Sequence, residues 1–258
     1  MRALAHVSDL HLGRDPATDD AARRLCAALL EAEVDQVLLT GDVTHRGRAA
    51  ELRRFQEIFA PLLLAGRLLV VPGNHDRMGD DVHRVWMGGA RVTASRLPGL
   101  HVVRVDSTAP HNRSLIRGHG LLTPADLEAV RRALDEAPPR ALVALMLHHH
   151  PMPLPEEDLA ERLASFFGWP FAAELPLGPA LLRALRGRCD LVLHGHRHVT
   201  SAAVLGEGAA RPLRVLNAGS TTLTRQFRVL EHDAGCLARE QWLAVPGEAA
   251  PALAPAAA

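Results

Sequence analysis

Short runs of apolar residues alternate with longer amphipathic stretches along this chain of 258 residues. The short runs have the length of strands and the longer stretches have helical spacing, so the pattern favours an α/β fold over an all-α or all-β fold. The predicted strands are Ala3–Ser8, Val34–Thr40, Leu68–Val71, Leu100–Val105, Ala141–Leu147, Cys189–Leu193, Leu213–Asn217 and Gln226–Leu230. The predicted helices are Asp19–Glu33, Ala49–Leu63, Pro124–Asp135, Glu156–Phe167 and Pro179–Arg186.

The pattern also predicts the domain organisation. With 48% hydrophobic residues, the chain is long enough for one large domain with a sizeable core, which we assign to residues 1–243. We expect the Pro- and Ala-rich tail, residues 244–258, to be disordered because it cannot bury enough apolar surface. Residues 151–179 form a Pro-punctuated insertion, which is a lid, a homodimer surface or a loop packed on the core. Its large rings are Phe166, Phe167, Trp169 and Phe171.

Composition narrows the classes of function. Basic and acidic residues number 29 each, so charge gives no support for extensive contact with nucleic acid. No apolar run is long enough to span a bilayer, and the first residues become charged too soon for a signal peptide. We therefore expect a cytoplasmic protein without a membrane span. The three cysteines are far apart and form no CxxC pair, which predicts reduced thiols.

Side chains of metal-ligand type follow five of the predicted strands, at the edge where open α/β sheets usually bind ligands. In extended chain, residues two apart project to the same side, so Asp9 with His11, and likewise His196 with His198, could reach one ion. A carboxylate at the edge, such as Asp42, can bridge two ions. Each motif alone is weak, but five together predict a metal site. The further members are Asn74, His75 and Asp76 after the third strand and His148, His149 and His150 after the fifth.

This donor set favours a particular chemistry. Oxygen and nitrogen ligands without thiolate suit Mn, Fe or Zn. Two such ions clamp the attacking and leaving oxygens of a phosphoester, and a water that bridges them loses a proton near neutral pH and attacks as hydroxide. The donor set therefore suits metal-assisted hydrolysis.

The ordered set D-x-H, GD, GNHD, H and GHxH, spanning roughly Ala3 to Ser220, resembles the calcineurin-like metallophosphoesterases. The segments HVSDLHLG, GDVTHRG, VVPGNHD, LHHHPMP and VLHGHRH are most similar to the bacterial class III cyclic-nucleotide phosphodiesterase and glycerophosphodiesterase-like branch. The resemblance implies a four-layer α/β/β/α sandwich of two mixed β-sheets flanked by helices. It also implies a metal-dependent phosphoric ester hydrolase that acts on a small-molecule phosphoester, a phosphodiester of the cyclic-nucleotide or glycerophosphodiester type. A phosphomonoesterase and a metal-bound interaction scaffold are the alternatives.

Carried over residue by residue, the resemblance implies two divalent ions that share Asp42. One ion would be held by Asp9, His11, Asp42 and His198. The other would be held by Asp42, Asn74, His148 and His196. His149 remains an alternative to His148, because only the alignment of the following Pro151-Met152-Pro153 with the branch's pattern selects between them.

The resemblance also suggests residues that act on the substrate. His75 matches the family's catalytic histidine, which would donate a proton to the leaving alkoxide or stabilise its charge. Asp76 would orient the His75 ring, or would simply cap a turn. His45 and His119 lie in loops after strands and are our first choices for substrate contact. His194 alternates with the last two ligands, and we expect it to pack in the interior or to support them.

Overall fold

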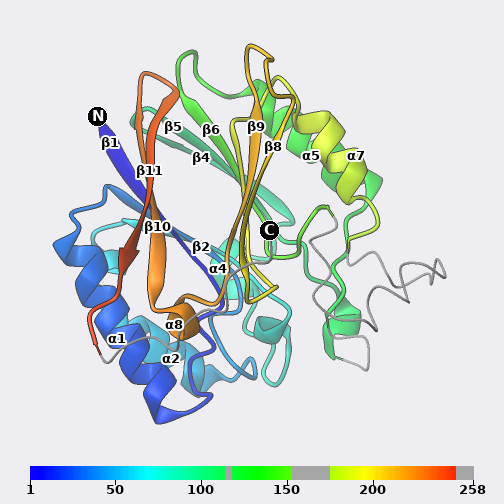
Figure 1. The fold of residues 1–258 in the computed structure, drawn as a ribbon. Helices are drawn as coiled ribbons and strands as arrows, with labels where there is room; N and C mark the ends of the chain where they lie inside the picture. Colours follow the sequence, from blue (N-terminus) through cyan, green and yellow to red (C-terminus); the bar gives the residue numbers. More distant parts are fainter. Residues whose placement is uncertain (114–117, 153–174, 248–258) are drawn as a thin grey trace, which may run out of the picture.

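Two mixed β-sheets pack face to face, with helices on their outer sides (Figure 1). This computed structural model describes residues 1–113, 118–152 and 175–247. The first sheet contains, in spatial order, β11 (Cys236–Ala244), β10 (Gln226–Asp233), β1 (Arg2–Val7), β2 (Gln36–Thr40) and β3 (Leu68–Val71). The second contains β4 (Val92–Leu97), β5 (Leu100–Val105), β6 (Leu142–Met146), β7 (Leu191–His194), β9 (Leu213–Ala218) and β8 (Thr200–Leu205).

Three hydrophobic cores separate four layers. In β2, Leu38 packs between the two sheets, whereas its neighbour Leu39 packs on the outer side of the first sheet, because successive strand residues point to opposite faces. Val130 and Leu181 join the outer core of the second sheet. The four-layer α/β/β/α sandwich is confirmed. The helices are α1 (Pro16–Glu31), α2 (Ala49–Ile58), α3 (Ala60–Leu64), α4 (Arg84–Met87), α5 (Pro124–Asp135), α7 (Gly178–Leu185) and α8 (Thr221–Thr224).

Several elements match the prediction and one helix does not. Strands β3 and β5 and helix α5 have the predicted bounds. The prediction of one helix over Ala49–Leu63 is wrong, because α2 ends at Ile58 and α3 begins at Ala60. Pro61 lies in the first turn of α3, where its missing N–H costs nothing, whereas inside a continuous helix it would break a hydrogen bond.

The strands β4, β8 and β11 were not predicted from the sequence. All three are edge strands that pair antiparallel with a single neighbour. Their residues are mostly half-buried or exposed, so they lack the short apolar run that marks a central strand.

Two predicted segments lie wholly or partly outside the described residues. The predicted helix Glu156–Phe167 and the four rings at 166–171 fall there, and so does the tail from residue 248. Before that point, Val245 is buried and its N–H donates to the carbonyl of Arg225 at 2.8 Å. Among the helices that the structure describes, none has the length and apolarity to cross a bilayer. The cysteines are free thiols, as predicted.

Candidate metal centre

Loops that leave the carboxyl ends of β1, β2, β3, β6 and β7 meet at one edge of the sandwich. Strands β1 to β3 run parallel to each other, as do β6 and β7, so each set delivers its following residues to a common edge. Eight of the residues predicted for the site come together there. They are Asp9, His11, Asp42, Asn74, His75, His148, His196 and His198.

The loop backbone sets the direction of these side chains, and the expectation of extended chain is wrong. The φ angles are 54° at Asp9, 49° at His11, 49° at Asp42 and 74° at His196. Such left-handed conformations cost about 1–3 kcal/mol each in residues other than glycine and persist only where neighbours hold them. The Asp9 N–H donates to the carbonyl of Gly41 at 3.1 Å, and the His11 N–H donates to that of Asp42 at 3.0 Å. The pairs two apart therefore owe their geometry to turns.

We call Asp9, His11 and His198 the outer group. The Nε2 atoms of His11 and His198 lie 3.0 Å apart. The Oδ1 atom of Asp9 lies 3.9 Å from the first of these nitrogens and 3.6 Å from the second. This oxygen is buried and has no hydrogen-bond partner. One carboxylate oxygen and two imidazole nitrogens thus face a common point.

We call Asp42, Asn74, His148 and His196 the inner group. The Oδ1 atom of Asn74 lies 3.0 Å from both His148 Nε2 and His196 Nδ1, and the two ring nitrogens are 3.2 Å apart. The Oδ2 atom of Asp42 lies 3.4 Å from His148 Nε2. These four side chains also converge on one point, so His196 and His198 belong to different groups, although the sequence suggested that both could reach one ion.

Asp42 joins the two groups. Its Oδ2 atom lies 3.8 Å from His11 Nε2 in the outer group and 3.4 Å from His148 Nε2 in the inner group. Gly41 permits this arrangement, because a Cβ at that position would lie 2.5 Å from the Nδ1 atom of His148. A single carboxylate oxygen therefore stands between two sets of ligand atoms.

The structure distinguishes between the two neighbouring histidines that the sequence left open. His148 Nδ1 donates to the carbonyl of Thr40 at 2.7 Å, which turns Nε2 toward the inner group. His149 Nδ1 instead lies 2.9 Å from the hydroxyl of Ser107. The same Ser107 hydroxyl accepts from the backbone N–H groups of His148 and His149 at 3.3 Å. Ser107 was not predicted, because no local sequence pattern links a serine after β5 to histidines after β6.

Electrostatics differs between the two groups. Burial lowers the pKa of His11 to about 3 and also lowers the pKa of His198, so both outer imidazoles are neutral. In the inner group, burial acts in the same direction on His148, but the charge and hydrogen bond of Asp42, the charge of Asp9 and the Thr40 carbonyl together outweigh it and raise the pKa of His148 to about 10. The pKa of Asp42 is correspondingly lowered. Burial raises the pKa of Asp9 to about 6.

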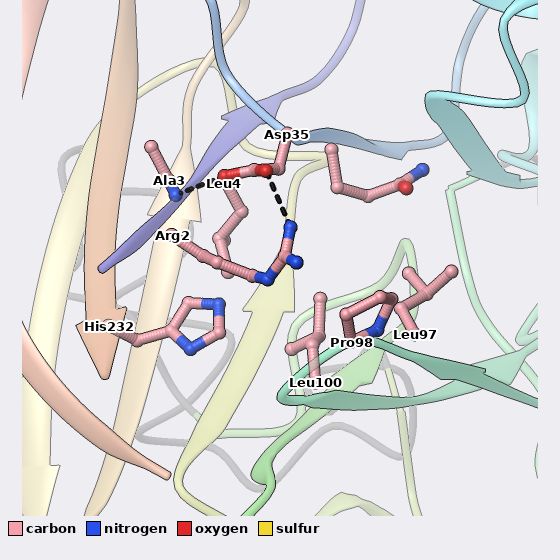
Figure 2. Close-up of a pocket in the computed structure, with 9 residues that line it drawn as sticks. Arg2, Ala3, Leu4, Asp35, Leu97, Pro98, Leu100 and His232 are labelled. Atoms are coloured by element: carbon pink, nitrogen blue, oxygen red, sulfur yellow. Dashed lines mark hydrogen bonds and ion pairs between the residues drawn. The ribbon is translucent and has the colours of Figure 1, made fainter. Parts of the chain in front are cut away.

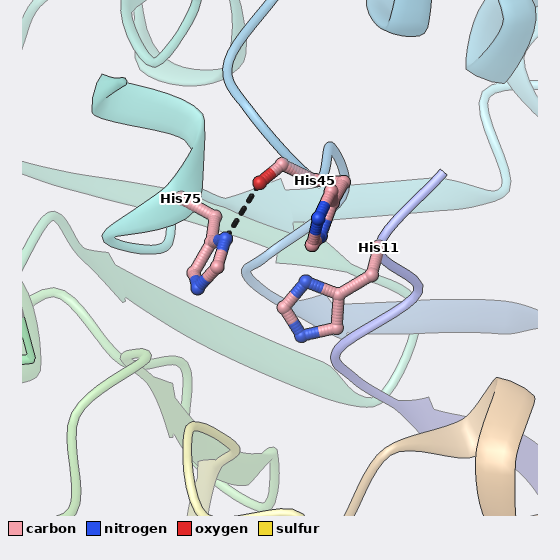
Figure 3. A group of neighbouring side chains, drawn as sticks. All are labelled: His11, His45 and His75. Carbon is pink, nitrogen blue, oxygen red and sulfur yellow. Dashed lines mark hydrogen bonds between the residues drawn. The ribbon is translucent and has the colours of Figure 1, made fainter. Parts of the chain in front are cut away.

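His75 lies beside both groups. Its Nδ1 atom donates to the carbonyl of His45 at 2.6 Å, and its backbone N–H donates to Asp42 Oδ1 at 2.9 Å. Figure 3 shows the His75 ring with the side chains of His45 and His11. The His75 ring centroid lies 4.7 Å from that of His11 and 5.7 Å from that of His45. The carbonyl can only accept, so Nδ1 carries the proton and Nε2 is the atom available for proton transfer.

Asp76 does not contact the His75 ring in the described contacts. Its carboxylate accepts from the N–H groups of Thr44 and Gly73, both at 2.9 Å, and from the Thr44 hydroxyl at 2.7 Å. The turn-capping alternative describes these contacts, and the His45 carbonyl takes the orienting role that the sequence suggested for Asp76.

The remaining histidines divide between the site and the interior. His45 reaches the cluster, with its ring centroid 5.9 Å from that of His11. His119 belongs to none of the described ligand groups, although an atom added at its neighbour Gly118 would lie 3.7 Å from the His196 ring. His194 is fully buried, and burial lowers its pKa to about 3, which fits a packed residue.

A separate cavity of about 80 Å³ lies at the opposite ends of the strands, near the start of β1 (Figure 2). Arg2 donates to Asp35 there at 2.8 Å, and Leu97 and Leu100 supply apolar walls. None of the site residues lines this cavity, so it is distinct from the cluster.

The donors fit divalent cations. Pairs of imidazole nitrogens face each other at 3.0 and 3.2 Å, and the buried Asp9 Oδ1 atom has no protein partner. Neutral imidazoles offer the lone pairs that metal ligation needs, and a cation in the inner group would take the place of the proton on His148. A four-layer sandwich with such a site defines a metal-dependent hydrolase class.

The chain belongs to the calcineurin-like phosphoesterase family, whose sequence pattern matches residues 3–200. This is a family of metal-dependent phosphoric ester hydrolases with a dinuclear metal site. One relative is the 3',5'-cyclic adenosine monophosphate phosphodiesterase CpdA of Pseudomonas aeruginosa, to which the chain is 33% identical over 125 residues. This alignment covers 48% of the chain and 43% of that relative. Another is a probable cyclic nucleotide phosphodiesterase of Vesicomyosocius okutanii, to which the chain is 28% identical over 79 residues. This alignment covers 29% of the chain and 33% of that relative.

Solved structures share the fold. A dimetal phosphatase from Danio rerio superimposes with a TM-score of 0.64 at 12% identity, over 95% of this chain and 99% of that one. A purple acid phosphatase from yellow lupin seeds gives 0.62 at 10% identity, over 94% of this chain and 53% of that one. The chain spans less than half of the length of these two curated relatives.

Proposed function

We propose that the protein is a dinuclear metal-dependent phosphodiesterase. The observation that carries the proposal is the position of Asp42 Oδ2, 3.8 Å from a ligand nitrogen of the outer group and 3.4 Å from one of the inner group. One carboxylate oxygen shared by two donor sets is the arrangement that two adjacent ions require. Oxygen and nitrogen donors without thiolate favour Mn, Fe or Zn.

The two groups divide the ligands between two ions. The outer position takes Asp9, His11, His198 and the shared Asp42, and the inner position takes Asn74, His148, His196 and Asp42. When bound, the two ions supply a water of lowered pKa as nucleophile and positive charge that offsets the phosphate. The protein residues supply the positions of these ions and a proton donor for the leaving group.

His75 is the proposed proton donor. Because its Nδ1–H is engaged by the His45 carbonyl, the protonated ring can release the proton on Nε2. As the bond between phosphorus and the leaving oxygen breaks, the departing alkoxide takes this proton and the ring becomes neutral. The His45 side chain, beside His75 and His11, is placed to contact the substrate. Contact by His119 stays a prediction.

The diester preference draws on the relatives. Both curated relatives are named as cyclic nucleotide phosphodiesterases or probable ones, and the match to the first extends over 125 residues. We therefore propose a small-molecule phosphodiester, of the cyclic-nucleotide or glycerophosphodiester type, as substrate. A cytoplasmic location and a homodimer through residues 151–179 stay predictions.

A substrate panel tests the proposal. The protein is stripped of metal, reloaded with Mn, and assayed on bis-p-nitrophenyl phosphate, cyclic AMP, a glycerophosphodiester and p-nitrophenyl phosphate. We expect kcat/KM to be at least about tenfold higher on a diester than on the monoester, a difference of about 1.4 kcal/mol in barrier. Two bound ions with faster monoester cleavage would make the protein a phosphomonoesterase. Two bound ions without any cleavage would leave the scaffold alternative.

A further inference from the structure

A buried segment that holds none of the proposed ligands lies against the outer group. This segment, residues 217–222, runs from the end of β9 into α8. Asn217 and Ser220 are fully buried, and Thr222 is 5% exposed. Polar side chains at such depth require partners, and these three find theirs on the loops that carry the outer group.

One end of the segment contacts the loop of His196 and His198. Asn217 pairs with His194 in the parallel ladder, next to the point where that loop begins. Its Nδ2 atom donates to the carbonyl of Arg197 at 3.1 Å, and its Oδ1 atom accepts from the N–H of Gly219 at 2.9 Å. A Cβ at Gly219 would lie 3.3 Å from the carbonyl of His198, so the two chains are in close contact.

The other end contacts the loop of Asp9 and His11. The Ser220 hydroxyl donates to the carbonyl of Asp9 at 2.8 Å, and the Thr222 hydroxyl donates to that of Leu10 at 3.2 Å. Between them, the Thr221 backbone N–H donates to the carbonyl of Ser8 at 3.0 Å. These bonds fix the peptide units on either side of the left-handed Asp9, and their orientation sets where its carboxylate and the next ligand point.

We propose that Ser220, Thr222 and Asn217 are positioning residues that join the two halves of the outer metal position and set its affinity for the ion. The proposal rests on the dinuclear function proposed above. The inner group has other supports, the Thr40 carbonyl and the Ser107 hydroxyl, and the described contacts show none between Ser220 or Thr222 and its ligands. The Asp9 carboxylate also accepts from the backbone N–H of His196 at 3.0 Å, so the effect should be largest at the outer ion and smaller at the inner one.

The test is Mn binding to metal-stripped full-length protein, followed by calorimetry and by the spectroscopic signal of a coupled Mn pair. We expect Ser220→Ala and Thr222→Val to weaken one of the two binding events by about 10- to 100-fold and to convert the coupled signal to that of a single ion. Thr224→Val is the matched control. Its hydroxyl donates only to the Ser220 carbonyl, at 3.0 Å, and that carbonyl keeps backbone donors within α8.

Double variants locate the weakened position. In an Asn74→Ala background, which removes an inner ligand, adding Ser220→Ala should lower the remaining affinity by the same factor. In a His11→Ala background, where only the inner position remains, it should lower the affinity by a much smaller factor. An inner affinity close to that of the wild type in Ser220→Ala also reports that the variant is folded, and Ser220→Thr, which keeps the hydroxyl, should restore the outer affinity.

Two results separate the inference from the function on which it rests. If the wild-type protein binds no pair of Mn ions, the proposed function falls. If the wild-type protein binds two ions and cleaves a diester while Ser220→Ala and Thr222→Val bind both ions as tightly, the function stands and the positioning role is wrong.

Discussion

The inner and outer groups use the same kinds of ligand in different surroundings. The inner His148 side chain is fully buried, whereas the outer His198 side chain is 44% exposed. Both groups combine ligands from loops of the two sheets, since His11 and His198 are 187 residues apart and Asn74 and His196 are 122 residues apart. We infer that the inner position holds its ion firmly and that the outer ion exchanges more readily. Two sites of similar composition can therefore differ in affinity through burial and support alone.

The two groups also differ in charge when no metal is bound. The inner group contains an ion pair between Asp42 and His148, and the outer imidazoles are neutral. Variants of these residues can test whether the two metal positions are separate and whether the inner one binds its ion more tightly.

The largest effect should come from Asp42→Asn, because Asp42 serves both positions. We expect the variant to lose both ions and its activity to fall by about 10³-fold or more, since the charge that holds two cations is removed. Metal analysis and the rate on bis-p-nitrophenyl phosphate measure this. Asp20→Asn, on the exposed side of α1, is the control. Retention of one ion with wild-type affinity would mean that Asp42 does not bridge.

His75→Asn should reduce turnover while leaving both ions in place. General acid catalysis contributes about 10²- to 10⁴-fold, and His75 is not a proposed ligand, so kcat should fall within that range. The control is His45→Asn, which keeps the carbonyl that orients His75 and should act mainly on KM. Loss of a metal ion from His75→Asn would place this residue in the outer group instead.

His148→Ala and His198→Ala compare the two positions directly. Without metal, His148→Ala leaves the buried Asp42 charge unpaired, which should cost about 3–5 kcal/mol of unfolding free energy. His198→Ala removes a half-exposed ring and should cost little. Urea unfolding in chelator measures both. We also expect excess Mn to restore activity to the His198 variant but not to the His148 variant. Equal losses would remove the distinction between the groups.

The last prediction concerns the pH dependence of the stability of the metal-free protein. The pKa of His11 is lowered to about 3, so the unfolded chain binds a proton below about pH 6.5 that the folded chain excludes. Stability should therefore fall as pH drops from about 6.5 toward 3, with His11 contributing up to about 1.4 kcal/mol per unit. The pKa of His148 is raised to about 10, so its contribution is present below about pH 6.5 and is lost as pH rises toward 10.

Two variants separate the loss of stability at low pH, the acid limb, from the loss at high pH, the alkaline limb. His11→Gln should flatten the acid limb of the stability curve, and His148→Gln should flatten the alkaline limb. The measurement is the midpoint of urea unfolding, determined in the presence of chelator across the pH range. If both variants keep the wild-type pH dependence, the contrast in charge between the groups is not real.

The local sequence alone determined the strands that consist of short apolar runs, and it determined the type of chemistry. A short apolar run between turn residues predicts a buried strand wherever it occurs, which is why β3 and β5 have the predicted bounds. The edge strands β4, β8 and β11 were not predicted because their residues are half-buried or exposed and form no such run. The ligand residues were found because they follow apolar runs that were predicted, those of β1, β2, β3, β6 and β7.

Only the tertiary structure decided how these residues combine. The choice of His148 over His149 depends on a carbonyl at Thr40, more than a hundred residues away in the chain. The resemblance assigned His196 and His198 to different ions, and the geometry behind this separation is a left-handed turn at His196 that alternation in extended chain cannot describe. The support from Ser107 and Ser220 comes through hydrogen bonds across packed loops. A sequence pattern records spacing along the chain, whereas a metal site depends on directions that distant neighbours impose.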